Sequence, residues 1–252
     1  MTANIVETSP WIRRFHPVED ARVRLLCLPH AGGSASFYFP LSKALSPSVD
    51  VLAVQYPGRQ DRRQERCIDS IPELADALLE EVLPWSDRPL ALFGHSMGAT
   101  LAFELARRCE QKRIVPLVVF VSGRRAPSRY RSESVHLRDD DGLIAELRKL
   151  NGTGAEVFGD DELLSMVLPA IRSDYRAVET YRYIPGPRLT APVRAYTGID
   201  DPKVTIDEVQ SWGEHTEGNF ALQTYPGGHF YLNEQAPHVI SSISQVISSL
   251  LP

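Results

Sequence analysis

Short runs of apolar residues alternate along the chain with segments in which apolar residues recur every three or four positions. Six runs have the length and composition of strands: Val23–Leu28, Val49–Val54, Leu90–Phe93, Leu117–Ser122, Val193–Thr197 and Phe220–Tyr225. Several of them are almost continuously apolar, which is typical of strands buried on both faces of a parallel sheet. The alternation therefore predicts an α/β fold with a mostly parallel central sheet flanked by helices.

Two segments between these runs have the apolar periodicity of helices. Ile71–Leu83 carries Pro72 in its first turn, where proline is favoured, and an apolar stripe along one face. Met97–Arg108 ends on two arginines, whose charge is favourable at the carboxyl end of a helix. Both segments lie directly between strand-like runs, as expected for the connections of a parallel sheet.

One stretch, from about Arg124 to Leu189, contains no strand-like run. Two helical patterns carry its apolar residues, Gly142–Leu150 and Asp161–Tyr181, and Pro169 inside the second predicts a kink or a break. Both flanks of the stretch lead straight back into predicted strands. We therefore expect a single domain over residues 1–252, in which residues 124–189 form a helical insertion, called the lid below.

The composition excludes several classes of protein. The 252 residues are 43% hydrophobic and 23% charged, and the formal net charge is −5. Disorder requires few apolar residues and a high net charge, and neither is found. A pI of about 5.8 argues against nucleic acid as a partner. The apolar run Val115–Val121 is far shorter than the roughly 20 residues that a membrane-spanning helix needs.

The cysteines and the start of the chain indicate the compartment. Cys27, Cys67 and Cys109 show no paired spacing, so we expect reduced thiols and neither disulfides nor a metal site. The first ten residues contain neither a basic segment nor an apolar core, so no signal peptide is predicted. These features predict a cytoplasmic protein that is not attached to a membrane.

The strongest chemical signal is the segment Gly94-His-Ser-Met-Gly98, which stands between a predicted strand and a predicted helix. In a G-x-S-x-G turn of this kind, small residues let the chain bend sharply so that the serine hydroxyl projects outward. Ser96 is therefore the candidate nucleophile. His95 beside it is expected to be a packed residue that shapes the turn.

The candidate base and acid follow later in the chain, because α/β hydrolases, which the G-x-S-x-G turn resembles, carry the serine first, then the acid and then the histidine. His229 stands in a glycine-containing loop directly after the last predicted strand, whereas His215 and His238 are expected to face solvent. The acid should follow the strand before it, where spacing cannot separate Asp200 from Asp201 cleanly. We favour Asp201, because the turn before Pro202 would hold it toward the histidine loop.

An oxyanion hole requires two backbone N–H groups. One candidate is Met97, directly after the nucleophile at the start of a predicted helix. The other is Ala31, in the loop Leu28–Ser34 after the first predicted strand, where two glycines permit a close approach of the backbone.

The chain resembles the type II thioesterases, which are stand-alone α/β hydrolases that accompany modular polyketide and non-ribosomal peptide synthases. The resemblance spans nearly the whole chain and rests on five motifs in order: Pro29-His-Ala-Gly-Gly-Ser34, Gln55-Tyr-Pro-Gly-Arg59, Gly94-His-Ser-Met-Gly98, Gly198-x-x-Asp201-Pro and Gly227-Gly-His-Phe230. It implies the α/β-hydrolase fold, a helical lid before the acid strand, and a triad of Ser96, Asp201 and His229. The Gln55–Arg59 segment is interpreted as structural support of the site.

The resemblance also implies a reaction and a partner. The reaction is hydrolysis of acyl thioesters on the phosphopantetheine arm of acyl or peptidyl carrier proteins, which removes wrong or stalled units; no cofactor of the enzyme itself is expected. Three alternatives remain open: a carboxylesterase or lipase acting on oxygen esters, an acyltransferase, and a non-catalytic protein that binds carriers.

A run of arginines marks the start of the lid. Arg124, Arg125, Arg129 and Arg131 follow one another without an intervening acidic residue, and they could contact an acidic carrier domain. A solvated basic stretch is an equally good interpretation of the run. The acidic total charge and the lack of a coiled-coil pattern predict a monomer.

Overall fold

The computed structural model describes residues 9–150 and 161–251, and its strands form one sheet in the order β1-β3-β2-β4-β5-β6-β7. The strands are β1 (Ile12–Arg13), β2 (Arg24–Leu28), β3 (Asp50–Val54), β4 (Leu90–His95), β5 (Val118–Ser122), β6 (Val193–Gly198) and β7 (Phe220–Tyr225). All neighbours are parallel except β1, which pairs antiparallel with β3. The six predicted strands are therefore confirmed within a residue or two at each end, and β1 adds a short edge strand.

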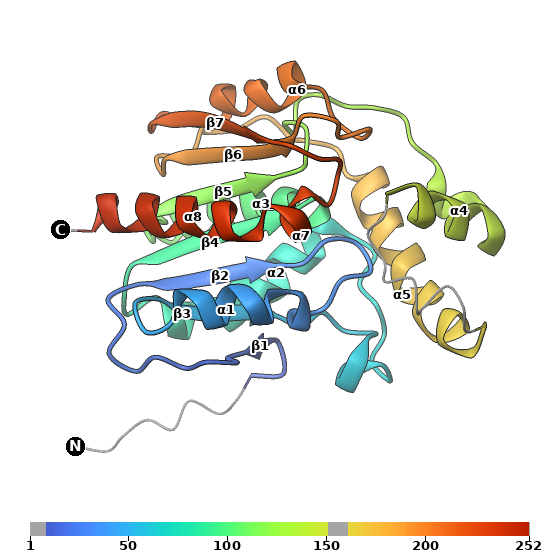
Figure 1. The fold of residues 1–252 in the computed structure, drawn as a ribbon, viewed down its shortest axis with the longest axis horizontal. Coiled ribbons are helices and arrows are strands. Elements are labelled where there is room, and N and C mark those ends of the chain that lie inside the picture. The colour runs from blue at the N-terminus through green and yellow to red at the C-terminus, as the bar shows by residue number, and fades with distance from the viewer. Residues whose placement is uncertain (1–8, 151–160, 252) are drawn as a thin grey trace.

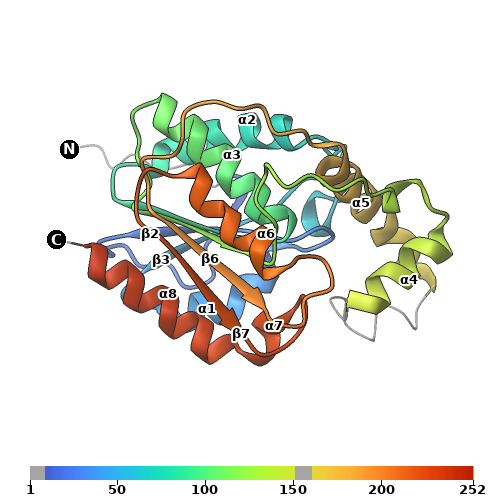
Figure 2. The same cartoon turned by 90° about the horizontal axis from the view of Figure 1, so that it is seen from above.

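Helices cover both faces of this sheet (Figure 2). The helices are α1 (Phe39–Leu45), α2 (Ile71–Val82), α3 (Met97–Gln111), α4 (Asp140–Leu150), α5 (Asp161–Thr180), α6 (Ile206–Gln210), α7 (Tyr231–Glu234) and α8 (Ala236–Leu250). The helices α2, α3 and α6 lie on one face, and α1 and α8 lie on the other. The predicted α/β class is confirmed.

Burial explains why the predicted runs become strands. Every residue of β2, β3, β4 and β5 is buried, because helices pack on both sides of the central strands. The edge strand β7 instead exposes several of its side chains. On α8 the buried residues Val239, Ile243 and Ile247 recur every four positions and form a single stripe against the sheet.

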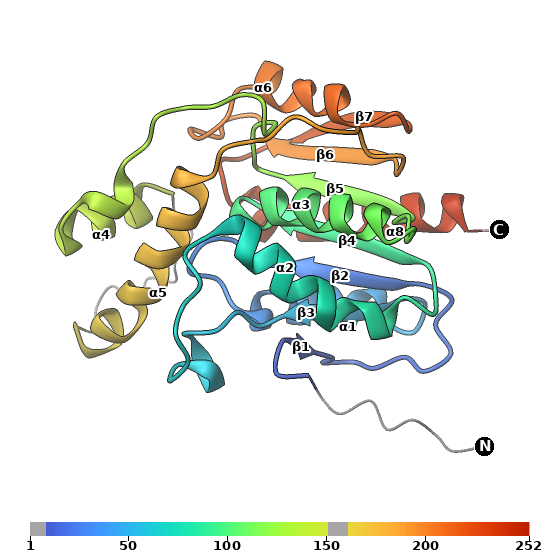
Figure 3. The ribbon, with the colours of Figure 1, turned by 180° about the vertical axis from the view of Figure 1, so that it is seen from behind.

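The helices α4 and α5 project beyond the ends at which the parallel strands terminate (Figures 1 and 3). They are the two helices predicted for the lid, between β5 and β6. A kink or a break was predicted at Pro169, and no break occurs, since α5 is continuous through this residue. Pro169 is exposed, whereas its neighbours Leu168 and Ala170 are buried, so apolar packing holds the helix on both sides of the missing hydrogen bond.

Some expectations concern compartment. Residues 151–160 of the predicted lid lie outside the described residues. So do residues 1–8, for which no signal peptide was predicted. Among the helices that are described, none combines the length and apolar character needed to cross a membrane. The three cysteines are free, and burial raises the pKa of Cys109 to about 11.

Candidate active site

Ser96 occupies a strained turn between β4 and α3. Its backbone has φ 55° and ψ −114°, an unusual conformation for a residue with a side chain. Two glycines make the turn possible: a Cβ atom on Gly98 would lie 2.0 Å from the Leu28 carbonyl oxygen, and one on Gly94 would lie 2.0 Å from the Gly98 carbonyl oxygen. The Ser96 N–H donates to the Ser122 carbonyl at 2.8 Å, which fixes the turn to β5.

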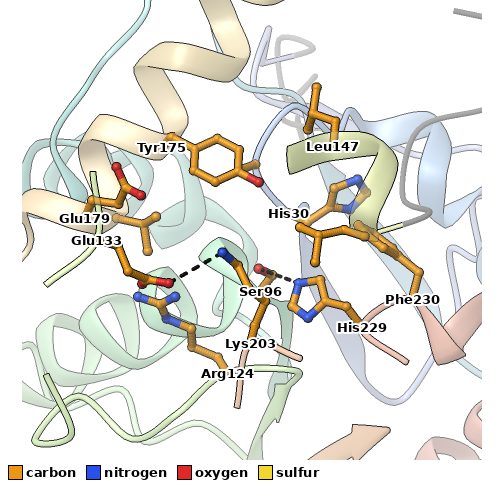
Figure 4. A pocket seen from close by; sticks show the side chains of 13 residues that line it. His30, Ser96, Arg124, Glu133, Leu147, Tyr175, Glu179, Lys203, His229 and Phe230 are labelled. Atoms are coloured by element: carbon orange, nitrogen blue, oxygen red, sulfur yellow. Dashed lines mark hydrogen bonds and ion pairs between the residues drawn. The ribbon is translucent and has the colours of Figure 1, made fainter. Parts of the chain in front are cut away.

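The structure brings together the three residues predicted as a triad. His229 Nε2 lies 3.0 Å from Ser96 Oγ (Figure 4), and His229 Nδ1 lies 2.9 Å from Asp201 Oδ2. Asp201 and His229 are both buried. The three side chains come from loops after β4, β6 and β7, whose parallel alignment places their carboxyl ends at one edge of the sheet.

The geometry separates the two candidate acids. Asp201 faces the imidazole, and its Oδ1 also accepts the Lys203 backbone N–H at 2.8 Å. Asp200 is exposed. The acid loop and the histidine loop are in close contact, since a Cβ atom on Gly198 would lie 2.3 Å from the Gly227 carbonyl oxygen.

Two other histidines, His95 and His30, lie near His229, and burial favours the neutral form of each. The His95 ring lies 5.1 Å from the His229 ring, and its Nδ1 is 2.9 Å from Ser122 Oγ. Burial lowers the pKa of His95 well below its ordinary value, and burial, then His229, then Arg59 lower the pKa of His30 to about 3. Burial therefore favours the neutral form of both neighbouring rings. His95 is the packed residue that was predicted.

The prediction that His215 faces solvent is wrong. Its ring packs against Phe103 of α3 at 5.5 Å and against Tyr183 at 5.0 Å, and its Nε2 lies 2.8 Å from Ser128 Oγ. The residues from Ser211 to His215 form a helical turn that carries His215 into the core together with Trp212. His238 is exposed, as predicted.

Both predicted oxyanion donors lie at the nucleophile. Met97 is the first residue of α3, where backbone N–H groups have no acceptor within the helix. Ala31 and Ser96 line the same cavity. The Gln55–Arg59 segment supports the Ala31 loop: the Tyr56 hydroxyl donates to the Pro29 carbonyl at 3.1 Å.

A narrow cavity with a volume of about 40 Å³ lies over Ser96 (Figure 4). The lid contributes apolar walls through Leu147 and Leu150 of α4 and Tyr175 and Val178 of α5. The remaining lining residues are His30, Ala31, Ser96, Arg124, Glu133, Glu179, Lys203, His229 and Phe230. The lid therefore encloses the reacting atoms and limits the size of any group bound there.

The arginine run does not form one cationic surface. Arg124 lines the cavity, and burial lowers the pKa of its guanidinium to about 10. Arg125 is buried and paired with Glu133. Arg129 and Arg131 are the exposed members, with side chains 41% and 38% exposed, and they pair with Glu214 and Glu208. Only these last two remain candidates for contact with a partner.

The sequence reasoning missed several charged residues of the site. Lys203 lies 2.7 Å from Glu146 of α4 and 3.4 Å from Glu133, so it connects the acid loop to the lid. Asp174 of α5 is also buried in the site region. It stands three residues after Ile171 and one before Tyr175, on the apolar stripe of the helix. A carboxylate on an apolar stripe was the signal that could have revealed it.

Metal ligation finds no support in the part of the chain that the structure describes. No group of three or more His, Cys, Asp or Glu side chains is placed there to hold a metal ion. The chemistry available at this site is that of a serine nucleophile, a histidine base and backbone N–H donors.

Comparisons with known proteins give a consistent picture. A family model described as thioesterase domain matches residues 23–247. The chain is 53% identical to thioesterase PikA5 of Streptomyces venezuelae over 95% of its own length and 86% of that protein. It is 52% identical to a probable cadicidin biosynthesis thioesterase of Streptomyces griseus, over 94% of its length and 66% of that protein. The solved structure of BorB, a type II thioesterase from the borrelidin biosynthetic cluster, superposes with a TM-score of 0.91 at 54% identity, covering 96% of this chain and 99% of that one.

Proposed function

Since the chain belongs to the thioesterase family, we propose that it releases acyl groups held as thioesters on the phosphopantetheine arm of carrier proteins. The carriers would be domains of a modular polyketide or peptide synthase, and release would clear wrong or stalled units. The observation that carries this proposal is the hydrogen-bonded chain from Ser96 through His229 to Asp201 beneath an enclosed cavity. We further propose that the enzyme acts as a cytoplasmic monomer and without a cofactor of its own.

The first half of the reaction transfers the acyl group to the enzyme. Ser96 Oγ attacks the thioester carbonyl carbon while its proton passes to His229 Nε2, which lies 3.0 Å away. The oxyanion that forms is stabilised by the N–H groups of Ala31 and Met97. When the carbon–sulfur bond breaks, His229 returns the proton to the leaving thiolate, and the acyl group remains on Ser96.

The second half releases the acyl group as an acid. A water molecule gives a proton to His229 and attacks the acyl-serine carbonyl, and the same N–H groups stabilise the second oxyanion. Collapse of this intermediate returns the proton to Ser96 Oγ. Asp201 holds the imidazole in the required tautomer and stabilises the imidazolium without taking its proton.

The cavity size supports a preference for short acyl groups. About 40 Å³ beside Ser96 is enough for a few non-hydrogen atoms while the lid helices keep the position described. A small acyl unit would fit there without displacing Leu147 or Tyr175. Removal of such small units is the chemistry that an editing enzyme requires.

Contact with the carrier is proposed for the surface at Arg129 and Arg131. Each is paired with a glutamate on or just after α6, and a carrier carboxylate would compete for the exposed guanidinium. Replacing both arginines with glutamate should raise KM for a carrier-bound substrate several-fold. The same change should leave KM for a small soluble thioester unaltered, and equal effects on both substrates would contradict this docking surface.

The central test loads acetyl, propionyl and longer acyl groups on a carrier domain and follows their release by mass spectrometry. We expect rapid release by the wild type and background release by Ser96→Ala. Release no faster than this background would overturn the proposed function. Faster cleavage of a matched oxygen ester than of the thioester would favour a carboxylesterase, and undiminished function of Ser96→Ala would favour a carrier-binding scaffold.

A further inference from the structure

A carboxylate of the lid contacts the backbone of the loop that holds Ala31. Asp174 lies on α5, and its side chain is only 1% exposed. Its Oδ2 accepts the Gly32 N–H at 2.7 Å. One turn earlier on the same helix, Ile171 packs so closely that a Cβ atom on Gly32 would lie 2.7 Å from Ile171 Cγ1. The helix α5 is therefore in direct contact with the backbone next to Ala31.

Arg59 holds the same carboxylate from the other side. Its Nη1 and Nη2 lie 2.6 Å and 2.8 Å from the two oxygens of Asp174, which is a bidentate pair. The Arg59 side chain is 8% exposed, so both charges are almost entirely removed from water. Nη1 also donates to the Gly33 carbonyl at 3.1 Å. Burial of two charges is costly unless each is paired and fully hydrogen-bonded, and this arrangement meets that condition.

These contacts fix the peptide groups that follow Ala31. The Gly33 N–H donates to the His30 carbonyl at 2.9 Å and closes a tight turn, in which Gly32 has φ 76°. In addition, the Asp174 carboxylate accepts a hydrogen bond from the Gly32 N–H, and the Arg59 guanidinium donates one to the Gly33 carbonyl. With its turn held in this way, the Ala31 N–H has little freedom to rotate away from the cavity.

We propose that Asp174 is a positioning residue of the reaction, which directs the Ala31 N–H toward the developing oxyanion, and that Arg59 orients Asp174 for this task. The inference rests on the oxyanion role of Ala31 in the proposed function. An oxyanion donor contributes because it is already oriented when charge develops, so loosening its loop raises the barrier without weakening substrate binding. The lid helix α5 is on this view a part of the catalytic apparatus.

A second buried aspartate provides a matched control. Asp50, the first residue of β3, is also 1% exposed and pairs with Arg14 at 3.0 Å and with Arg24 at 3.6 Å. It lies at the amino end of its strand, whereas Ser96 follows the carboxyl end of β4 in the same parallel sheet. Asp50→Asn removes a comparable buried charge without touching the Ala31 loop.

The experiment compares wild type, Asp174→Asn, Asp50→Asn and Ser96→Ala. Four quantities are measured: kcat and KM for a small soluble thioester, the affinity for a trifluoromethyl ketone, and the melting temperature. The ketone carbon bonds to Ser96 Oγ, the proton passes to His229, and the resulting oxyanion occupies the same hole. Asp174→Asn should lower kcat about 10- to 100-fold, change KM little, and weaken ketone binding by the same factor as kcat/KM.

The control separates positioning from simple stability. Asp50→Asn should lower the melting temperature about as much as Asp174→Asn while leaving kcat and ketone affinity within about twofold of wild type. Equal kinetic losses in the two variants, or unchanged ketone affinity in Asp174→Asn, would overturn the proposal. A wild type no faster than Ser96→Ala would instead refute the proposed function.

A further variant covers the case in which Asp174→Asn does not fold. Arg59→Lys keeps the positive charge but loses the bidentate pair and cannot hold both Asp174 and Gly33 as Arg59 does. It should show the same parallel loss of kcat and ketone affinity, to a smaller extent. Unchanged kinetics in Arg59→Lys would likewise overturn the proposal.

Discussion

The two halves of the active site are built on different principles. In the core half, Ser96, Asp201 and His229 stand after the ends of parallel strands, and main-chain hydrogen bonds hold the turns that carry Ser96 and Asp201. In the lid half, α4 and α5 supply walls to the same cavity through side-chain packing. The core half therefore supplies the nucleophile, the base and the acid, and the lid half bounds the space beside them.

The two helices of the lid half differ in how they pack against the rest of the protein. Ala177 and Val178 of α5 belong to the main core, and Asp174 is tied to Arg59. The helix α4 instead packs into a small separate cluster that includes Leu143 and Leu147. The helix α5 is therefore continuous with the main core, whereas α4 reaches the core half through its small cluster and through the ion pair between Glu146 and Lys203.

The largest effect should follow from removing the nucleophile of the core half. Ser96→Ala deletes the atom that forms the acyl-enzyme, and kcat should fall by up to about 10⁶-fold. The fold should be retained, since Ser96 Oγ faces the cavity and the backbone contact to Ser122 is kept. Steady-state kinetics with a soluble thioester and a melting curve measure the two quantities. A large loss of stability would contradict the separation of chemistry from folding in this half.

The next effect concerns the acid. Asp201→Asn should lower kcat by about 10⁴-fold, because the amide favours the wrong tautomer of His229. Asp200→Asn provides the matched control one residue away, and it should leave kcat within about twofold because that side chain is exposed. The same kinetic assay serves for both variants. Similar losses in the two would mean that the acid assignment is wrong.

A smaller effect should follow from opening the wall of the lid half. Leu147→Ala removes apolar atoms from α4 beside the cavity, so longer acyl chains gain room. The ratio of kcat/KM for a hexanoyl over a propionyl thioester should rise about tenfold. Leu41→Ala on α1 is the control, since Leu41 is equally buried but lies outside this cavity. An unchanged ratio would show that α4 does not limit acyl length.

The smallest effect is the contribution of His30 to the pH dependence of the free energy of unfolding. Burial lowers the pKa of His30 to about 3 from an ordinary value near 6.5, so between these values the unfolded chain binds a proton that the native state excludes. The free energy of unfolding should therefore fall as the pH falls through this window, by about 2 kcal/mol between pH 6.5 and pH 5 for this group. Urea unfolding of His30→Gln should show a correspondingly weaker dependence on pH.

The exposed His238 offers the control for that measurement. His238→Gln removes a histidine that is exposed in the native state, and it should leave the pH dependence as it is in the wild type. Equal pH dependence in the wild type and in His30→Gln would contradict a neutral His30 in the cavity that His229 also lines.

Much of the fold was predictable because its signals are local. Each central strand is a short apolar run, and burial on both faces requires such a run. The strand β1 has two residues and exists only through its pairing with β3, so no periodicity could reveal it. The helix from Asp161 was predicted, but its continuity through Pro169 was not, because this continuity depends on packing within the lid.

The residues of the site likewise fall into those that a local sequence signal reveals and those that it does not. Ser96 and His229 follow from a turn motif and from the order of the strands, which are local and topological signals. The choice between Asp200 and Asp201 required the direction of each side chain, which spacing does not give. The four arginines likewise could not be told apart in the sequence, yet Arg124 lines the cavity and Arg125 is buried in an ion pair with Glu133. Which of these side chains are buried depends on contacts between the lid and the core, and a local sequence pattern does not specify such contacts.

The distance along the chain between Ser96 and His229 has a consequence for biosynthesis. The two residues that must share a proton are separated by 133 positions, and β7 follows all the other described strands along the chain. A nascent chain can fold its first strands and form the serine turn early, but it holds no base until the loop after β7 has been made. Hydrolytic activity should therefore appear only once this loop has emerged, so a polypeptide that stops before His229 cannot discharge the thioesters of its own cell.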